Sequence, residues 1–330
     1  MPVVHARPHP VKVLIPERLR PYLGQLPSMV NADWYTGVDA CIDSVPDAEV
    51  LMVDFGVPDK RIRDRRHAGI QRALEAGTAL KWVATLATGV ENWPFDVLRK
   101  RRLTLTNSAG MNSIPISEFV VMVLLAGLKS LPDLVRAQDR GEWLAKPPAL
   151  GELHGKRALI YGYGRVGREI AARLRPFGVR VTGVRRHSTN EIGVISSTAW
   201  ESHLPETDVL ILSVPLTTAT NRLVGPMQLS ALPQGAWVVN IARGGLIDEV
   251  ALIDALKTGH LGGACLDVAV EEPLDSASEL WSLRNAIITP HASWASSRAL
   301  ERGAEIFSDN LQRYCLGEEL SNRVDLRARY

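Results

Sequence analysis

Residues 157–167 read RALIYGYGRVG, a short apolar run followed at once by glycines spaced as Gly-x-Gly-x-x-Gly. This pattern predicts a buried strand, a tight turn and the start of a helix, the arrangement that cradles the pyrophosphate of a dinucleotide. Gly162 would permit the turn, Gly164 would let a phosphate approach the backbone, and Gly167 would let the helix pack closely on the strand. A helix over about Val166 to Phe177 would then aim its N-terminal amides and positive dipole end at the phosphates.

The next apolar run bears on the choice of cofactor. Residues 179–184 are predicted as a strand, and Arg185 and Arg186 follow it. An NAD site usually carries Asp or Glu here for the ribose 2′-hydroxyl. Arginines favour a 2′-phosphate instead, since each charge-assisted hydrogen bond contributes about 1.5–3 kcal/mol. We therefore expect NADP(H) to be preferred and NAD(H) to be possible, the alternative being that the two arginines are only a solvated strand end.

The composition is that of an ordinary globular protein. The chain has 330 residues, 46% apolar and 22% charged, which is too long for one hydrophobic core and predicts two domains. A net charge of +2 with interspersed signs gives no reason to expect nucleic acid or membrane as a partner. Cys41, Cys265 and Cys315 are far apart, so we expect neither a disulfide framework nor a metal site. No stretch reaches the ~20 apolar residues of a membrane span, and a cytoplasmic location is expected.

Apolar, β-branched runs alternate with helical patterns along most of the sequence, which predicts an α/β fold with parallel sheets. The runs form two series, at residues 11–15, 49–54, 80–85 and 103–106, and at 158–161, 179–184, 208–215, 236–242, 264–268 and 286–290. A long apolar helix over 115–141 is predicted between them, and a last helix over about 296–316 would return to the first series. We predict two doubly wound domains: a Rossmann dinucleotide-binding domain over 108–296 and a discontinuous flavodoxin-like substrate domain over 1–107 and 297–330.

Arg243, Glu272 and His291 each follow one of the last three predicted strands. Because reactive groups gather beyond the carboxyl ends of an open parallel sheet, we expect these side chains to lie together. The planar fork of Arg243 suits a carboxylate and an adjacent carbonyl, and His291 can give or take a proton near neutral pH. Glu272, hydrogen-bonded to the imidazole, would orient it and favour its charged form.

Two of the carboxylates allow a second interpretation. Glu272 stands before Pro273 and could simply end a loop. Asp267 lies within an apolar run, so it is either a partner for the nicotinamide carboxamide, which we favour, or a buried carboxylate satisfied by its own chain.

Several segments, in this order, resemble the D-isomer-specific 2-hydroxyacid dehydrogenase family. They are residues 106–112 (TNSAGMN), 162–167, 240–244 (NIARG), 267–274 (DVAVEEPL) and 289–291 (TPH). The likeness covers most of the chain. It implies that Arg243, Glu272 and His291 are the catalytic set, and that a hydride passes between a 2-hydroxy acid and the nicotinamide.

The resemblance also assigns binding residues. Substrate would contact the loop formed by Leu86, Ala87, Thr88 and Gly89, through its amides, together with Arg243 and His291. The alternative for this loop is an ordinary connection between a strand and a helix. Cofactor would be bound by Gly162, Tyr163, Gly164, Arg165, Val166, Gly167, Arg185, Arg186, Val214, Pro215, Thr220, Ala242 and Asp267.

We therefore expect an NADP(H)-preferring oxidoreductase of small 2-oxo or 2-hydroxy acids, similar to glyoxylate or hydroxypyruvate reductases, acting as a homodimer through the nucleotide domain. The alternative is a dinucleotide-sensing, corepressor-like binding protein with little turnover, against which Arg185 and Arg186 count. Trp294 adds unusual bulk after the histidine. With Arg298 it would either shape the substrate pocket or lie at the surface.

Overall fold

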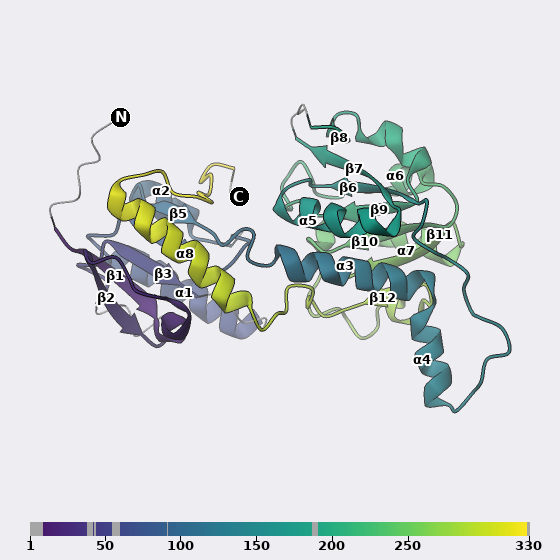
Figure 1. Ribbon diagram of the computed structural model, residues 1–330, viewed down its shortest axis with the longest axis horizontal. Helices are drawn as coiled ribbons and strands as arrows, with labels where there is room; N and C mark the ends of the chain where they lie inside the picture. The colour runs from purple at the N-terminus through teal and green to yellow at the C-terminus, as the bar shows by residue number, and fades with distance from the viewer. Residues whose placement is uncertain are drawn as a thin grey trace. The chain divides into compact units, whose positions relative to one another are not determined.

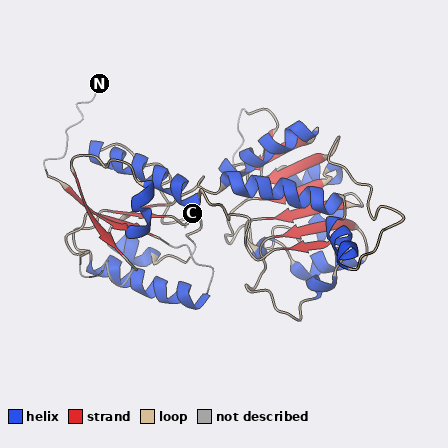
Figure 2. Cartoon of the chain, turned by 60° about the horizontal axis from the view of Figure 1, so that its bottom comes forward, coloured by secondary structure: helices blue, strands red, loops and turns tan. Residues whose placement is uncertain are grey.

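The computed structural model describes residues 9–37, 42, 44–54, 60–90, 92–186 and 191–328. The chain forms two compact units, which we call unit 1 (Met1–Met111 with Ser296–Tyr330) and unit 2 (Asn112–Ala295). The domain limits expected from the sequence fall after residues 107 and 296, and the chain passes between the units after residues 111 and 295. Both units are parallel sheets covered by helices (Figure 2), which confirms the predicted fold class.

Unit 1 is built on a five-stranded sheet in the order β2-β1-β3-β4-β5, with every pair parallel. This is the flavodoxin-like order. The strands are β1 (Val11–Pro16), β2 (Val30–Tyr35), β3 (Val50–Val53), β4 (Trp82–Thr85) and β5 (Thr104–Thr106). The sequence did not predict β2, because this edge strand is only half-buried and contains no apolar run.

Strand β1 shows how the sheet of unit 1 is covered on both faces. Val13 and Ile15 pack on one face with helix α8 (Ala299–Leu316), while Leu14 packs on the other face with helix α1 (Lys60–Ala76). On the α8 face, the buried Trp82 ring lies 5.5 Å from Phe307 and 5.2 Å from Tyr314. The described part of unit 1 also contains the helices η1 (Glu17–Tyr22) and α2 (Phe95–Lys100).

Arg302 of α8 joins the two places where the chain leaves unit 1. Its Nε donates to the carbonyl of Met111 at 2.7 Å, and its Nη2 donates to the hydroxyl of Ser296 at 3.0 Å. These residues are the last of the first segment and the first of the second segment of unit 1. The last helix is therefore part of unit 1, and it begins at Ala299 rather than near Ser296.

Unit 2 contains a seven-stranded parallel sheet in the order β12-β11-β10-β9-β6-β7-β8 (Figure 1). The strands are β6 (Arg157–Tyr161), β7 (Arg180–Arg185), β8 (Val194–Ser196), β9 (Val209–Leu212), β10 (Ala236–Asn240), β11 (Leu261–Leu266) and β12 (Ala286–Ile288). The order is that of a Rossmann sheet extended by one strand, with its switch point between β6 and β9. The short edge strand β8 was not predicted, since its three residues are all half-buried.

Helices cover both faces of the sheet in unit 2. They are α3 (Ser113–Leu128), α4 (Leu131–Asp139), α5 (Arg165–Leu174), η3 (Arg175–Phe177), η4 (Trp200–Glu206), α6 (Pro226–Ala231), η5 (Gly244–Leu246), α7 (Glu249–Lys257) and η6 (Glu279–Ser282). The single long helix predicted over 115–141 is wrong. Ser130 adopts a left-handed φ of 49° and Pro132 follows it, so the chain breaks into α3 and α4.

Within the described ranges, no single helix is long and apolar enough to cross a membrane. Helices α3 and α4 together pass by length and composition, although they are bent by 68°. In the same residues, no three His, Cys, Asp or Glu side chains are grouped as metal ligands would be.

Candidate functional site

The glycine turn lies at the switch point of the sheet in unit 2. Gly162 follows β6 with a φ of +107°, and a Cβ at this position would lie 2.1 Å from the carbonyl oxygen of Ser213, directly after β9. Its amide donates to the carbonyl of Val184 at 3.1 Å. Only glycine fits here, because both the conformation and the contact with the chain after β9 exclude a side chain.

The other two glycines of the turn have different surroundings. A Cβ on Gly167 would lie 2.4 Å from the carbonyl oxygen of Gly162, so this glycine allows α5 to pack on the turn. Gly164, the N-cap of α5, has an ordinary φ of −86°, and a Cβ there would meet no protein atom within 4 Å. The space beside Gly164 is therefore open, as the approach of a pyrophosphate to the helix N-terminus requires.

Tyr163 packs inside unit 2, and its predicted contact with the cofactor stays a prediction. Its side chain is buried, its amide donates to the carbonyl of Val184 at 2.9 Å, and its hydroxyl accepts from Arg175 at 3.0 Å. A Cβ on Gly183 of β7 would lie 2.3 Å from the ring. Arg165 and Val166, predicted beside it, form the first turn of α5 next to the open space at Gly164.

Arg185 and Arg186 lie where the sequence placed them, at the carboxyl end of β7, and both are exposed. The backbone of this pair is held by the segment after β8. The amide of Ser197 donates to the carbonyl of Arg185 at 2.7 Å, and the Ser197 hydroxyl donates to the carbonyl of Arg186 at 3.4 Å. Both arginines thus stand at the end of the strand next to β6.

The loop after β9 contains the predicted cofactor contacts Val214, Pro215 and Thr220. The Thr220 hydroxyl donates to the carbonyl of Pro215 at 2.7 Å and accepts from the amide of Thr217 at 2.8 Å. Thr220 therefore shapes this loop, which begins beside the glycine turn and contains the exposed Pro215.

Arg243 follows β10, which ends at Asn240 rather than at the predicted Ala242. The buried Asn240 carboxamide donates to the carbonyl of Arg243 at 2.8 Å and accepts from the amide of Ala242 at 3.1 Å. Asn240 thus sets the turn that contains Arg243. No separate role was predicted for Asn240, although a buried amide at the end of an apolar strand is a recognisable signal.

A close approach of two loops brings Arg243 near Glu272. A Cβ on Gly244 would lie 2.0 Å from the carbonyl carbon of Ala269, so only glycine lets the loop after β10 rest on the loop after β11. The amide of Ala269 in turn donates to Oε1 of Glu272 at 3.3 Å. The Arg243 charge therefore acts on Glu272 and helps to lower its pKa.

Glu272 and His291 form the predicted pair. Nδ1 of His291 lies 2.9 Å from Oε2 of Glu272, and both side chains are about one third exposed. Burial acts to raise the pKa of Glu272, but the hydrogen bond and charge of His291, with Arg243 and the amide of Ala269, hold it below its usual range. With Nδ1 facing the carboxylate, Nε2 is the nitrogen left for proton exchange. Glu272 therefore does more than end a loop.

Asp267 has the surroundings of a buried carboxylate that is satisfied by its own chain, one of the two interpretations that the sequence left open. Strand β11 ends at Leu266, and the Asp267 side chain is only 1% exposed. Its Oδ1 accepts from the Thr289 hydroxyl at 2.6 Å and the amide of Ala292 at 2.8 Å, and its Oδ2 accepts from the amide of Ser293 at 2.9 Å. The carboxylate is satisfied by the segment that contains His291, and its contact with a nicotinamide stays a prediction.

The predicted substrate loop follows β4 in unit 1. The amide of Leu86 donates to the carbonyl of Val53 at 3.1 Å, and the amide of Ala87 donates to the Thr85 hydroxyl at 3.1 Å. These two amides are therefore committed to the protein, and contact of Leu86 and Ala87 with substrate stays a prediction. Within this loop the exposed Thr88 and the half-buried Gly89 are the better candidates for holding a carboxylate.

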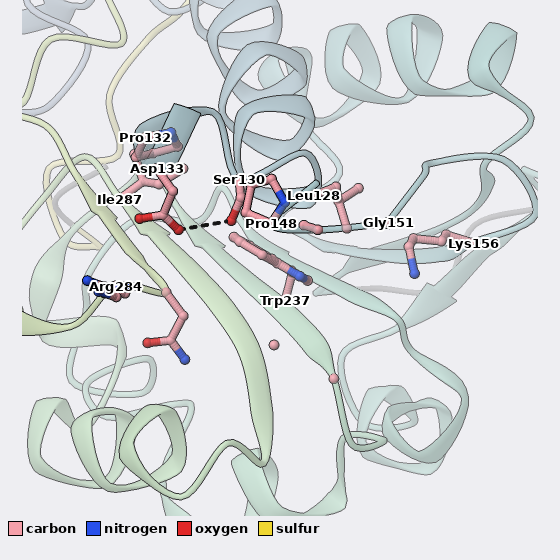
Figure 3. Close-up of a pocket in the computed structure, with 15 residues that line it drawn as sticks. Leu128, Ser130, Pro132, Asp133, Pro148, Gly151, Lys156, Trp237, Arg284 and Ile287 are labelled. Carbon is pink, nitrogen blue, oxygen red and sulfur yellow. Dashed lines mark hydrogen bonds between the residues drawn. The ribbon is translucent and has the colours of Figure 1, made fainter. Parts of the chain in front are cut away.

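A hollow of about 400 Å³ opens elsewhere on unit 2 (Figure 3). It is lined by Ser130 and Asp133 at the start of α4 and by Trp237 and Arg284 near the amino ends of β10 and β12. The candidate residues lie beyond the carboxyl ends of the strands. This hollow is therefore at the opposite edge of the sheet and is not the predicted site.

The fold and the glycine turn define a protein of the dinucleotide-binding class. Residues 121–293 match the family model described as D-isomer specific 2-hydroxyacid dehydrogenase, NAD binding domain. A D-3-phosphoglycerate dehydrogenase from Methanocaldococcus jannaschii is 30% identical over 289 residues, covering 86% of this chain and 53% of that protein. A glyoxylate reductase from Pyrococcus furiosus is 35% identical over 259 residues, covering 75% of this chain and 76% of that one.

Among solved structures, a D-isomer specific 2-hydroxyacid dehydrogenase from Xanthobacter autotrophicus in complex with NADPH superimposes with a TM-score of 0.77. It is 26% identical, and the match covers 98% of this chain and all of that one. The chain thus belongs to the D-isomer-specific 2-hydroxyacid dehydrogenase family. It spans about half the length of the phosphoglycerate dehydrogenases that it matches.

Proposed function

We propose that this protein is an NADP(H)-preferring reductase of small 2-oxo acids such as glyoxylate or hydroxypyruvate. The observation that carries the proposal is the pair of His291 and Glu272, 2.9 Å apart, with Arg243 acting on the same carboxylate. An acid, a base that orients it and a fixed cation are the groups that carbonyl reduction needs. The names of the relatives agree with this chemistry, since they include a glyoxylate reductase and an NADPH complex.

In this proposal each group has a distinct role. The Arg243 guanidinium binds the substrate carboxylate and polarises the neighbouring carbonyl. His291 donates a proton from Nε2 to the carbonyl oxygen, while Glu272 holds Nδ1 and stabilises the imidazolium. A nicotinamide cofactor bound along the Gly162–Gly167 turn would supply the hydride. Unit 2 thus contains both the nucleotide turn and these three side chains.

The preference for NADP(H) rests on the exposed Arg185 and Arg186, which stand where a carboxylate would select the 2′-hydroxyl of NAD. The same two arginines count against the alternative of a dinucleotide-sensing binding protein.

The test is the initial rate of NADPH and NADH oxidation with a panel of 2-oxo acids. We expect turnover with small oxo acids and a lower KM for NADPH than for NADH. Tight cofactor binding without turnover of any oxo acid would favour the sensor.

We also propose a homodimer formed through unit 2. Helix α4 exposes Leu131, Leu134 and Val135, between 40% and 48% each, and the segment after it exposes Trp143 and Leu150, at 96% and 85%. Exposed apolar side chains concentrated on one projecting segment are typical of an interface between subunits. Light scattering on the purified protein should give twice the chain mass, and Val135→Asp should give a monomer.

A further inference from the structure

The peptide group that follows His291 is held at both of its ends. Its carbonyl oxygen, that of His291, accepts a hydrogen bond from the indole Nε1 of Trp294 at 2.7 Å. Its amide, that of Ala292, donates to Oδ1 of the buried Asp267 at 2.8 Å. Two side chains from different parts of unit 2 therefore fix one peptide plane, immediately after the histidine that we place in the active site.

This fixation matters because His291 is in an unfavourable backbone conformation. Its φ is +53°, in the left-handed region that L-residues other than glycine rarely adopt. Such a conformation persists only where the surrounding contacts determine it. A hydrogen bond from the amide of His291 to the carbonyl of Thr289, at 3.0 Å, holds the preceding peptide as well.

The backbone at His291 sets the direction of its side chain. If the peptide after His291 rotated toward an ordinary φ, the Cα–Cβ bond would turn with it and the imidazole would leave the Glu272 carboxylate. The distance of 2.9 Å between Nδ1 and Oε2 therefore depends on the hydrogen bonds of the next peptide. Asp267 is almost fully buried, whereas Trp294 is half-buried and can be changed without leaving a buried charge unpaired.

We propose that Trp294 is a positioning residue for His291: its indole N–H holds the left-handed peptide and thereby aims the imidazole at Glu272 and the substrate. This inference deepens the proposed function and rests on it for the role of His291. It differs from both expectations for this residue, a wall of the substrate pocket and a passive surface side chain. Arg298, considered with it, forms an ion pair with Glu301 at 2.8 Å and is exposed.

The test is Trp294→Phe, which keeps an aromatic ring and removes the N–H donor together with part of the indole. Trp281→Phe is the matched control, because the Trp281 indole also donates to a backbone carbonyl, that of Asp275 at 2.9 Å, and its side chain is 54% exposed. Both variants should bind NADPH with an affinity within about twofold of wild type, measured by the emission of the bound cofactor.

We expect Trp294→Phe to lower kcat about tenfold, the cost of one misplaced catalytic group, while the KM for NADPH is unchanged. In the reduction direction, the acid limb of the kcat/KM profile should move to higher pH. The charged groups that face Glu272 are His291 and Arg243. When the imidazole leaves, its hydrogen bond no longer opposes the effect of burial, so the pKa of the Glu272 carboxyl rises. Trp281→Phe should change neither quantity.

A second readout does not depend on turnover. The ring nitrogens of His291 can be followed by NMR in protein with ¹⁵N-labelled histidine, with His291→Ala to assign the signals. We expect these signals to shift in Trp294→Phe and to stay in place in Trp281→Phe. If wild type reduces no oxo acid, the proposed function fails while this measurement still decides the role of Trp294.

Two results would overturn the inference. Unchanged His291 signals with a raised KM for the oxo acid would make Trp294 a wall of the pocket. Unchanged signals and an unchanged pH profile, with only a lower melting temperature, would make it a structural residue.

Discussion

Replacement of Gly164 by Ala separates binding of the cofactor from folding. The added Cβ would meet no protein atom within 4 Å, and the φ of −86° suits alanine. The stability of the protein should therefore change by less than about 0.5 kcal/mol, or rise slightly because alanine restricts the unfolded chain. The methyl group would, however, occupy the space through which we propose that the pyrophosphate approaches α5.

The expected loss of affinity follows from the contact removed. If the methyl group displaces one charge-assisted hydrogen bond between phosphate and backbone, the cost is about 1.5–3 kcal/mol. The Kd for NADPH should then rise roughly tenfold to a hundredfold. Isothermal titration calorimetry measures this directly, and thermal unfolding without cofactor measures the stability.

Two other glycines supply the controls. Gly225 is also the extended N-cap of a helix in unit 2, so Gly225→Ala should leave the Kd unchanged. Gly162→Ala should instead destabilise the protein by about 2–6 kcal/mol, from strain and overpacking against Ser213, which lowers the melting temperature by roughly 4–20 °C. Unchanged NADPH affinity in a stable Gly164→Ala protein would refute the assignment of this turn to the cofactor.

Replacing both Arg185 and Arg186 by Ala should lower the ratio of kcat/KM for NADPH to kcat/KM for NADH at least about tenfold. The control Arg180→Ala, at the other end of β7, should leave this ratio unchanged. An unchanged ratio in the double variant would disprove the role of the two arginines. The pKa of Glu272 is held below its usual range, so the stability that its ion pair contributes is present above the unfolded pKa and is lost as the pH falls through the lower folded pKa. Melting temperatures measured between about pH 3 and 6 should therefore fall less steeply with falling pH in Glu272→Gln than in wild type. Identical curves for the two proteins would contradict this prediction. Arg302→Met should lower the stability of unit 1 by roughly 1–3 kcal/mol, because the two hydrogen bonds that join the two chain segments of unit 1 are lost. An unaltered thermal unfolding curve would show that these two hydrogen bonds contribute nothing.

Local patterns were sufficient for the sheets and for the contact between Glu272 and His291. The glycine turn, the apolar runs and the polar residues after each strand are encoded within a few neighbouring residues, and parallel sheets bring the strand ends to one edge. This is why Arg243, Glu272 and His291 were predicted as one group. The edge strands β2 and β8 were missed because a half-buried strand carries a weaker apolar signal.

The remaining features depend on hydrogen bonds between distant residues. The sequence does not reveal that the amides of Ala292 and Ser293 satisfy Asp267, or that the Thr85 hydroxyl takes the amide of Ala87. The inward position of Tyr163 likewise depends on the space above Gly183 in the neighbouring strand. Assigning a polar group to a ligand requires knowing which of its hydrogen bonds the protein already supplies.

Transfer of deuterium tests the proposed reaction most directly. The protein is incubated with glyoxylate or hydroxypyruvate and with NADPH deuterated at the transferable position of nicotinamide carbon 4, and the 2-hydroxy acid is examined by mass spectrometry. We predict a single deuterium on carbon 2 of the product, and no labelled product from His291→Ala, although that variant still binds NADPH. Product without deuterium, or equal labelling by wild type and His291→Ala, would contradict hydride transfer at the site formed by Arg243, Glu272 and His291.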